Sequence, residues 1–297
     1  MMSRISVLEW NIHASASMGW SNDYSINTWI VDAIIDKNCD VVVINEFVVS
    51  IGWDYFQKRL KENDYAWFMT YTSKENGILI AIKKEKFSVV NWNDVNIVNK
   101  LSSDKNDMEP DFIHIKVNYN NEPLNIIGVR IKVCTDAMNI DEDYKCRAQQ
   151  FELLCKYLSN IKEKTIVLGD FNNGNIFREY DKNQLYHNCA RQYYNYQMIW
   201  REVEEKLKWR LDTPDKGGNY GNKFSIVTRD PNGKVYYTKE DHVISRGCKM
   251  LNCDYLWDFM GNTDVYGELK CDSYKSNLKY IPDHANFSQN QHAASDL

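Results

Sequence analysis

Short runs of apolar residues recur along this chain, and they predict β-strands with buried faces. The run from Thr165 to Gly169 is the clearest, because it stops at a glycine and is followed directly by the polar Asp170. Other runs alternate weakly between apolar and polar positions, as half-buried strands do. In all, strands are predicted at residues 5–10, 41–44, 66–71, 77–82, 87–92, 112–117, 124–133, 165–169, 224–228, 235–237 and 241–245.

A second pattern, in which apolar residues return every three or four positions, predicts amphipathic helices. One helix follows Ser25, which can cap its first turn, and ends at Lys37. The longest helix covers residues 142–159, and its acidic start suits the positive end of the helix dipole. Two more helices are predicted at residues 53–61 and 193–207.

Turn signals connect these elements. Asn120-Asn121-Glu122 separates two strands and predicts a hairpin, and Asp230-Pro231-Asn232-Gly233 predicts another. Strands that are joined by hairpins and interrupted by a few helices indicate an α/β sandwich, with two sheets face to face and helices outside. The 297 residues could make two average domains or one large one.

Composition and charge narrow the class of protein. Hydrophobic residues make up 43% of the chain and aromatic residues 13%, which is enough to fill a sizeable core. The formal net charge is −5. A non-specific grip on duplex DNA needs many contacts from Lys and Arg to phosphates. The net charge therefore argues against tight, non-specific binding of nucleic acid over a large surface. A local basic groove is still compatible with it.

The eight cysteines form no CxxC pair and show no zinc-like spacing with histidine. Cys146 and Cys155 fall on the pattern of the long helix, where buried free thiols are ordinary. Residues 1–4 lead straight into a strand without the apolar segment of a signal peptide. We therefore expect a reduced, cytoplasmic protein, with secretion by another route as the alternative. No apolar run is long enough to span a membrane.

Polar residues stand next to several predicted strands and could carry chemistry. Each of them alone is weak evidence, because a lone carboxylate after a strand is usually a solvated turn residue. Because strand residues alternate sides, Asp170 and Asn172 are predicted to point the same way. The complete set is Asn11, Glu46, Asp170 with Asn172, Asp241, and Asp283 with His284.

Together these residues offer what hydrolysis of a phosphate ester requires. Glu46 is a hard oxygen ligand of the kind that Mg²⁺ prefers. Asp170 can orient or deprotonate the attacking water, and Asn172 can donate to a phosphate oxygen. Asp241 can pair with His284 and favour its charged form. An imidazolium beside the phosphorus would then offset the developing negative charge.

The same residues resemble the endonuclease/exonuclease/phosphatase family, which has the DNase I-like fold. The matching motifs occur in the family's order and span most of the chain: Leu8-Glu9-Trp10-Asn11-Ile12, Asn45-Glu46-Phe47, Gly169-Asp170-Phe171-Asn172, Asp241-His242-Val243-Ile244-Ser245 and Pro282-Asp283-His284-Ala285-Asn286.

The resemblance implies one catalytic domain over residues 1–297, built as a four-layered α/β sandwich with two mixed, mainly antiparallel sheets. It also implies phosphoester hydrolysis that depends on a divalent metal, Mg²⁺ or alternatively Mn²⁺. Its roles carry over onto this chain by motif. They are Asn11, Glu46 and Asp283 around the metal, Asp170 and Asn172 at the nucleophile, and the pair of Asp241 and His284 at the phosphate.

One position departs from the resemblance. Where the family usually has His or Tyr near the end of a strand, this chain has Arg130. Arginine is effectively always protonated, so it is a poor proton donor to a leaving group. Arg130 is better suited to clamp a phosphate through two parallel N–H bonds, and a structural ion pair is the alternative.

Three functions remain open at this point. The first is an intracellular phosphodiesterase or nuclease that acts on DNA or RNA. The second is a phosphatase of a small phosphorylated molecule such as a nucleotide or an inositol phosphate, which the acidic balance and Arg130 favour. The third is a non-catalytic binding protein on the same scaffold. No membrane association and no obligate protein partner are expected.

Overall fold

The computed structural model describes residues 4–12, 28–49, 52–70, 76–101, 109–134, 139–173, 193–214, 224–229, 235–256 and 286–293. Within them one sheet has six strands, of which only the β1–β2 pair is parallel. Its order is β14 (Cys248–Leu256), β15 (Asn286–Ala293), β1 (Arg4–Asn11), β2 (Val41–Phe47), β4 (Gly77–Lys83) and β3 (Tyr65–Met69).

The second sheet has seven described strands, and only its β8–β9 pair is parallel. Its order is β10 (Arg210–Asp212), β13 (Asp241–Arg246), β9 (Lys164–Asp170), β8 (Glu122–Arg130), β7 (Asp111–Tyr119) and β5 (Phe87–Ser88), with β6 (Ile97–Val98) also on β7. A separate hairpin joins β11 (Ile226–Arg229) to β12 (Val235–Thr238).

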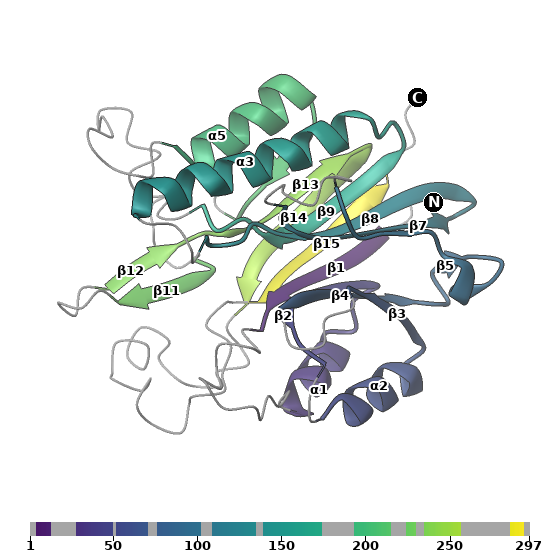
Figure 1. Ribbon diagram of the computed structural model, residues 1–297. Coiled ribbons are helices and arrows are strands. Elements are labelled where there is room, and N and C mark those ends of the chain that lie inside the picture. The colour runs from purple at the N-terminus through teal and green to yellow at the C-terminus, as the bar shows by residue number, and fades with distance from the viewer. Residues whose placement is uncertain are drawn as a thin grey trace.

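Helices cover the outer face of each sheet, so that the molecule has four layers (Figure 1). Helices α1 (Thr28–Lys37) and α2 (Trp53–Glu62) lie on the first sheet, and α3 (Ile140–Ser159) and α5 (Tyr196–Trp200) on the second. The predicted α/β sandwich is therefore confirmed.

Both faces of the central strands are buried, which explains why their sequences are nearly continuous apolar runs. In β9, Ile166 and Leu168 belong to the core between the two sheets, whereas Val167 packs in the outer layer with α3. In β1, Val7 and Leu8 divide in the same way between the inner core and the layer under α1 and α2. The two-residue period of a strand thus feeds two different cores.

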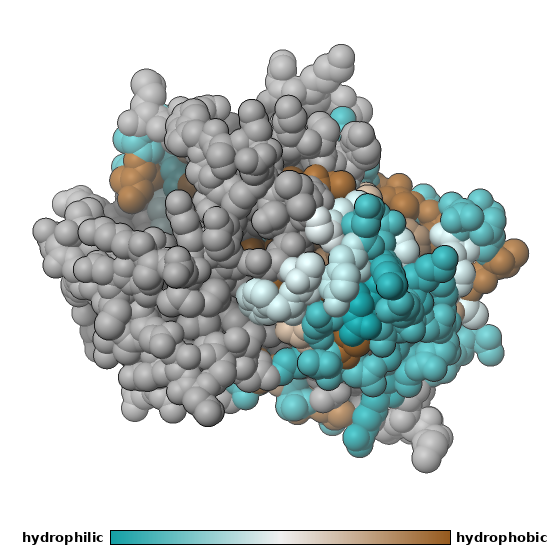
Figure 2. Space-filling model, turned by 90° about the horizontal axis from the view of Figure 1, so that it is seen from below, coloured by the Kyte–Doolittle hydropathy of each residue, from teal (hydrophilic) through white to brown (hydrophobic). Residues whose placement is uncertain are grey.

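The outer surface on the side of α1 and α2 follows the ordinary rule for a solvated face. Viewed from below, the described part of this face is mainly hydrophilic, with scattered hydrophobic residues (Figure 2). Helix α2 illustrates this, because Phe56 and Leu60 are buried while most of its charged residues are exposed or half-buried. Among the described residues, no helix combines the length and the apolar composition that a bilayer crossing would need.

Three predicted elements differ from the structure. The strand expected at residues 87–92 is only two residues long, and residues 92–94 form a 3-10 helix that begins after the capping side chain of Asn91. The strand expected to reach residue 133 ends at Arg130. The helix expected at residues 193–207 divides into the five-residue α5 and a π-helical segment, η4 (Arg201–Leu207).

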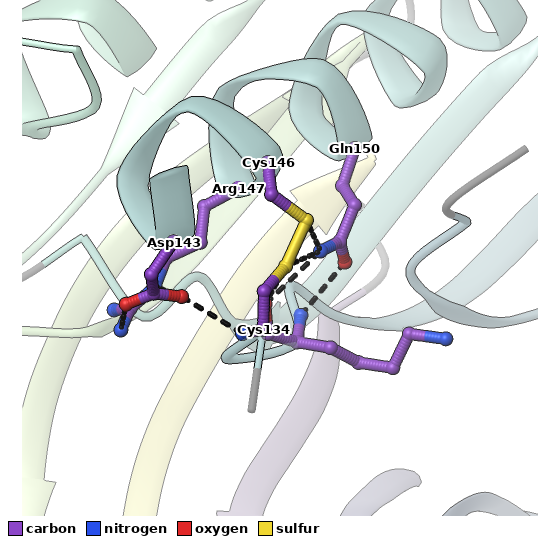
Figure 3. Close-up of a disulfide and its surroundings, with 6 residues drawn as sticks. Cys134, Asp143, Cys146, Arg147 and Gln150 are labelled. Atoms are coloured by element: carbon purple, nitrogen blue, oxygen red, sulfur yellow. Dashed lines mark hydrogen bonds and ion pairs between the residues drawn. A yellow bond between two sulfur atoms is a disulfide. The ribbon is translucent and has the colours of Figure 1, made fainter. Parts of the chain in front are cut away.

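The expectation that Cys146 is a free thiol is wrong. Cys146 on α3 forms a disulfide with Cys134, which lies in the segment after β8 (Figure 3). The segment after β8 contacts the first turns of α3, and this tertiary contact leaves no signal in the spacing of the two cysteines. Because disulfides persist mainly in oxidising environments, this bond removes the cysteine argument for a reducing compartment. Cys155 is a buried free cysteine, as expected.

Candidate active site

Four of the predicted site residues meet at one end of the sandwich. Asn11 and Glu46 come from β1 and β2 of the first sheet, and Arg130 and Asp170 end β8 and β9 of the second. The side-chain nitrogen of Asn11 donates to Glu46 Oε1 at 3.3 Å and to Asp170 Oδ2 at 3.0 Å. Arg130 Nε lies 3.4 Å from Glu46 Oε1. These contacts join the two sheets, and they bring distant parts of the chain into one cluster.

A bulge in β2 directs Glu46 into this cluster. The pairing of β2 with β4 shifts between Asn45 and Phe47, so that Glu46 stands outside the regular register. Its φ is +52°, a left-handed conformation that non-glycine residues rarely adopt. Bulges of this kind re-aim a side chain and occur often beside active sites. The second carboxylate oxygen, Oε2, accepts from Asn76 Nδ2 at 3.1 Å.

Gly169 sets how closely β8 and β9 approach each other beside the cluster. The two strands run parallel, with Gly169 opposite Val129 and Asp170 opposite Arg130. A Cβ atom on residue 169 would lie 1.9 Å from the carbonyl oxygen of Val129. Only glycine therefore fits, and its presence before the aspartate follows from the packing of Arg130 and Asp170 side by side.

The side chain of Asn172 lies next to Asp170, but not because the two residues alternate along one strand. The strand ends at Asp170, and Asn172 has a φ of +46° in a tight turn. Its backbone N–H donates to Asp170 Oδ1 at 2.8 Å, and its side-chain nitrogen donates to Asp170 Oδ2 at 2.9 Å. The same nitrogen also donates to the carbonyl oxygen of Ile131 at 2.8 Å. The proximity was predicted, but its geometric reason was wrong.

Arg130 lies between two carboxylates. Besides Glu46, it contacts Asp111, whose Oδ2 accepts from Arg130 Nη1 at 3.1 Å. Lys132 Nζ lies 3.9 Å from the other oxygen of Asp111. The side chains of Arg130 and Glu46 are only 12% and 13% exposed. The cluster thus holds carboxylates and cations in close alternation at the edge of the sandwich.

Asp241 lies next to Asp170 on the neighbouring strand. It is the first residue of β13, pairs with Asp170 across the antiparallel ladder, and is fully buried. Its backbone oxygen accepts from the hydroxyl of Tyr255 at 2.6 Å. Burial raises the pKa of Tyr255, so that the hydroxyl stays protonated as a donor. Asp283 and His284, and with them the predicted pair of Asp241 and His284, lie outside the described residues.

The described residues fit part of a site for a small hard cation. Glu46 supplies a carboxylate, and the amide side chain of Asn11 lies beside it. Mg²⁺ is usually held by one or two carboxylates together with water and substrate oxygens. Within the described residues, no group of three or more His, Cys, Asp or Glu forms a complete metal cluster. A full site would therefore need donors beyond these two residues.

Two contact residues of this cluster were not predicted. Asn76, which binds Glu46, stands just before β4 and carries no motif. Asp111 could have been found from the hairpin of β7 and β8. Counting outward from the turn at Asn120 and Asn121 pairs residue 111 with Arg130, which is the observed register.

His242, which follows Asp241 on β13, makes structural contacts. It is fully buried, and its Nδ1 and Nε2 lie 2.9 Å from Thr213 Oγ1 and 2.8 Å from Asn173 Oδ1. Its ring packs against those of Phe171 and Tyr196. This histidine ties β13 to the segment after β9 beneath the cluster.

Comparison with known proteins identifies the family and supports the fold. The family model described as "Endonuclease/Exonuclease/phosphatase family" matches residues 8–257. The chain belongs to this family, which comprises enzymes that hydrolyse phosphate esters. Comparison with curated protein sequences gives no match.

Solved structures share the fold over nearly the whole chain. A D. rerio TDP2 complexed with single-strand DNA product is 13% identical, with a TM-score of 0.60, over 97% of this chain and 99% of that one. ANGEL2, a 2',3'-cyclic phosphatase, in complex with adenosine-2',3'-vanadate is 13% identical, with a TM-score of 0.62, over 98% and 96%. The human Nocturnin catalytic domain with bound sulfate is 13% identical, with a TM-score of 0.59, over 98% and 95%.

Proposed function

We propose that this protein is a divalent-metal-dependent phosphodiesterase that cleaves DNA or RNA by attack of water on phosphorus. One observation carries the proposal. Asn11 bridges Glu46 of one sheet and Asp170 of the other, so that a candidate metal ligand and a candidate base lie next to each other. Such a pairing suits a reaction in which a cation holds the phosphate while a carboxylate handles the water.

Asp170 is our candidate for the residue that orients or deprotonates the water. Three hydrogen bonds from Asn11 and Asn172 reach its carboxylate, and every one of them comes from an N–H donor. This arrangement suits an ionised carboxylate, which only accepts. It also holds the acceptor in one orientation, which general-base catalysis requires.

Arg130 is our candidate for the phosphate clamp. Its contacts with Asp111 and Glu46 involve Nη1 and Nε, whereas a guanidinium carries five N–H donors in a rigid fork. The remaining donors can bind a phosphate oxygen with charge assistance. Because Arg130 stays protonated, we assign it to binding the phosphate and not to protonating the leaving group.

Glu46 and Asn11, together with Asp283, would hold the cation. A bound Mg²⁺ or Mn²⁺ would supply Lewis-acid stabilisation of the negative charge on the phosphate. We further propose that Asp241 orients His284, whose imidazolium would offset charge on the same phosphate. These roles of Asp241, Asp283 and His284 rest on the motifs in the sequence.

A nucleic-acid substrate is supported by the family and by its structural relatives. The D. rerio TDP2 structure holds a single-strand DNA product, and ANGEL2 is described as a cyclic phosphatase bound to an adenosine compound. In this chain, Arg130 and the half-exposed Lys132 place two cationic side chains at the cluster, beside the carboxylates of Glu46 and Asp111.

A phosphatase of a small phosphorylated molecule is the second candidate. The presence of Arg130 where the family usually has His or Tyr favours it, because a monoester phosphate carries more charge for an arginine to bind. The acidic balance of the chain favours it as well. Release of inorganic phosphate without cleavage of nucleic acid would select this candidate.

The deciding experiment is an activity screen with Mg²⁺ or Mn²⁺. Plasmid DNA, abasic duplex, single-stranded DNA, RNA and a panel of phosphate monoesters are incubated with the wild type and with Glu46→Gln. We expect cleavage of at least one nucleic acid, and a loss of roughly 100-fold or more in Glu46→Gln. Even the outer partners of metal ligands are worth about 10–100-fold.

The matched control is Glu122→Gln. Glu122 is an exposed carboxylate at the start of β8, paired with Lys164, and it should leave the rate unchanged. The proposal of a hydrolase is refuted if the wild type turns over none of these substrates. It is also refuted if Glu46→Gln retains full activity.

A further inference from the structure

Helix α3 contacts the turn that carries Asn172 through one buried side chain. Arg147 Nη1 donates to the backbone oxygen of Asn172 at 2.7 Å. Arg147 is only 8% exposed, although it lies on a helix at the outside of the sandwich. A charged group is buried in this way only when it is well paired, so the contact is a built feature of the fold.

Asp143, one turn earlier on α3, holds the guanidinium in place (Figure 3). Arg147 Nε donates to Asp143 Oδ1 at 3.0 Å, and Nη2 donates to Asp143 Oδ2 at close range. The ring of Tyr144 lies 4.5 Å from the guanidinium carbon. Such a fork-to-carboxylate pair fixes the plane of the guanidinium, so Nη1 points at Asn172 without further ordering.

Asp143 also contacts the segment after β8. Asp143 Oδ1 accepts from the backbone N–H of Cys134 at 2.8 Å. Gln150, one turn further along α3, accepts from Lys132 N at 2.8 Å and donates to Lys132 O at 3.0 Å. Together with the disulfide, these bonds attach the segment after β8 to α3 (Figure 3). Arg147 attaches the segment after β9 to the same helix.

Asn172 is the residue whose geometry depends most on this attachment. Its left-handed backbone is a conformation that persists only where surrounding contacts stabilise it. Its N–H is bound by Asp170 and its carbonyl oxygen by Arg147, so both of its peptide groups are fixed. With both fixed, the side-chain nitrogen is held against Asp170 and Ile131.

We propose that Arg147 is a positioning residue for phosphoester hydrolysis, which acts by fixing the peptide of Asn172 and thereby the carboxylate of Asp170. The inference rests on the function proposed above. Arg147 does not contact the other candidate catalytic side chains in the described structure; its effect passes through Asn172. Misplacing a catalytic group by about 1 Å can lower a rate by about 100-fold, so a distant tether of this kind is sufficient.

Arg147→Lys is the main test variant. A lysine keeps the positive charge beside Asp143, but its single ammonium group lacks the fork that serves Asp143 and Asn172 together. We expect kcat to fall about 10–100-fold while KM changes less than about 3-fold, since an interaction that orients the reacting groups affects the chemical step. Arg59→Lys is the matched control, because Arg59 also pairs with an aspartate, Asp32, and lies on α2.

A double-mutant cycle separates positioning from general stability. In the Asn172→Ala background the side-chain bonds of residue 172 are lost, while its backbone N–H can still donate to Asp170. Arg147→Lys should therefore lower kcat less in this background than in the wild type. Equal losses in both backgrounds would overturn the proposal. So would a change confined to KM.

A readout without turnover keeps this test separate from that of the function. The side-chain amide of Asn172, labelled with ¹⁵N, should show slow hydrogen exchange in the wild type because it donates to two oxygens. Arg147→Lys should shift this signal and speed its exchange, and Arg59→Lys should do neither. If the wild type hydrolyses no phosphoester, the proposed function fails, whereas the amide signal still decides whether Arg147 positions Asn172. An unchanged amide signal in Arg147→Lys would refute the positioning role.

Discussion

Arg130 pairs with two carboxylates of the site at the same time. Its guanidinium contacts Glu46 on the opposite sheet and Asp111 on the adjacent strand. Both contacts also have a structural effect, because each pairs the guanidinium with a carboxylate. The family usually has an uncharged or titratable ring at this position, so the permanent charge of Arg130 should alter which phosphate the site prefers.

Replacing Arg130 by alanine tests this role. A hydrogen bond to a charged group is worth about 1.5–3 kcal/mol, so kcat/KM should fall roughly 10–150-fold if the partner is a phosphate. Arg130→Lys should recover part of the loss, because it restores the charge without the fork. The check is kcat/KM for each variant beside its thermal midpoint. A lower midpoint with unchanged kcat/KM would restrict Arg130 to structure.

At the level of single residues, the sequence predicted identities better than contacts. Glu46, Asp170 and Asn172 could be selected because several polar groups beside strands occur in one chain, in the order of a family's motifs. The bulge that aims Glu46 could not be read, since it depends on pairing with β4. Arg147 was equally invisible, because its partner is a backbone oxygen of a residue 25 positions away.

At the level of elements, α3 shows what periodicity can and cannot predict. The predicted helix at residues 142–159 compares well with the observed Ile140–Ser159, which begins after the side-chain cap of Asn139. The apolar stripe and the acidic first turn carried that information. The disulfide that joins α3 to the segment after β8 was not predicted. A disulfide between two scattered cysteines depends on their proximity in the folded protein and not on the local sequence pattern.

Removing this disulfide should destabilise the protein. The bridge joins residues 12 positions apart, and closing a loop of about 15 residues is worth about 3 kcal/mol in the chain-entropy account. We therefore expect the double variant Cys134→Ser, Cys146→Ser to lose roughly this much unfolding free energy in urea. A thiol reductant should lower the stability of the wild type in the same direction.

The control for this prediction is Cys248→Ser. Cys248 is a free, partly buried cysteine, and burial raises its pKa to about 11, which keeps its thiol unreactive. This variant should respond to reductant as the wild type does. A wild type whose urea midpoint is indifferent to reductant would show that the bridge contributes nothing.

At the level of the whole molecule, the spacing of the two sheets governs the site. Two contacts of the site cross from one sheet to the other. They are the hydrogen bond from Asn11 to Asp170 and the ion pair of Arg130 with Glu46. Gly128 lies in β8, two residues before Arg130, and packs against the first sheet. A Cβ atom there would lie 2.7 Å from Ile78 Cγ2 and 3.0 Å from Val43 Cγ1, both on the first sheet.

Gly128→Ala should therefore press the sheets apart beside the site. Overpacking a core typically lowers stability by about 1–3 kcal/mol, and here we expect kcat/KM to fall as well, because the bonds between the sheets lengthen. Leu60→Val is the control: it removes volume between α2 and the first sheet, so it should lower stability while leaving kcat/KM unchanged. Unfolding in urea and steady-state kinetics on both variants provide the measurement. Equal kcat/KM in the two variants would contradict this prediction. It would mean that the activity of the site does not depend on the spacing of the two sheets.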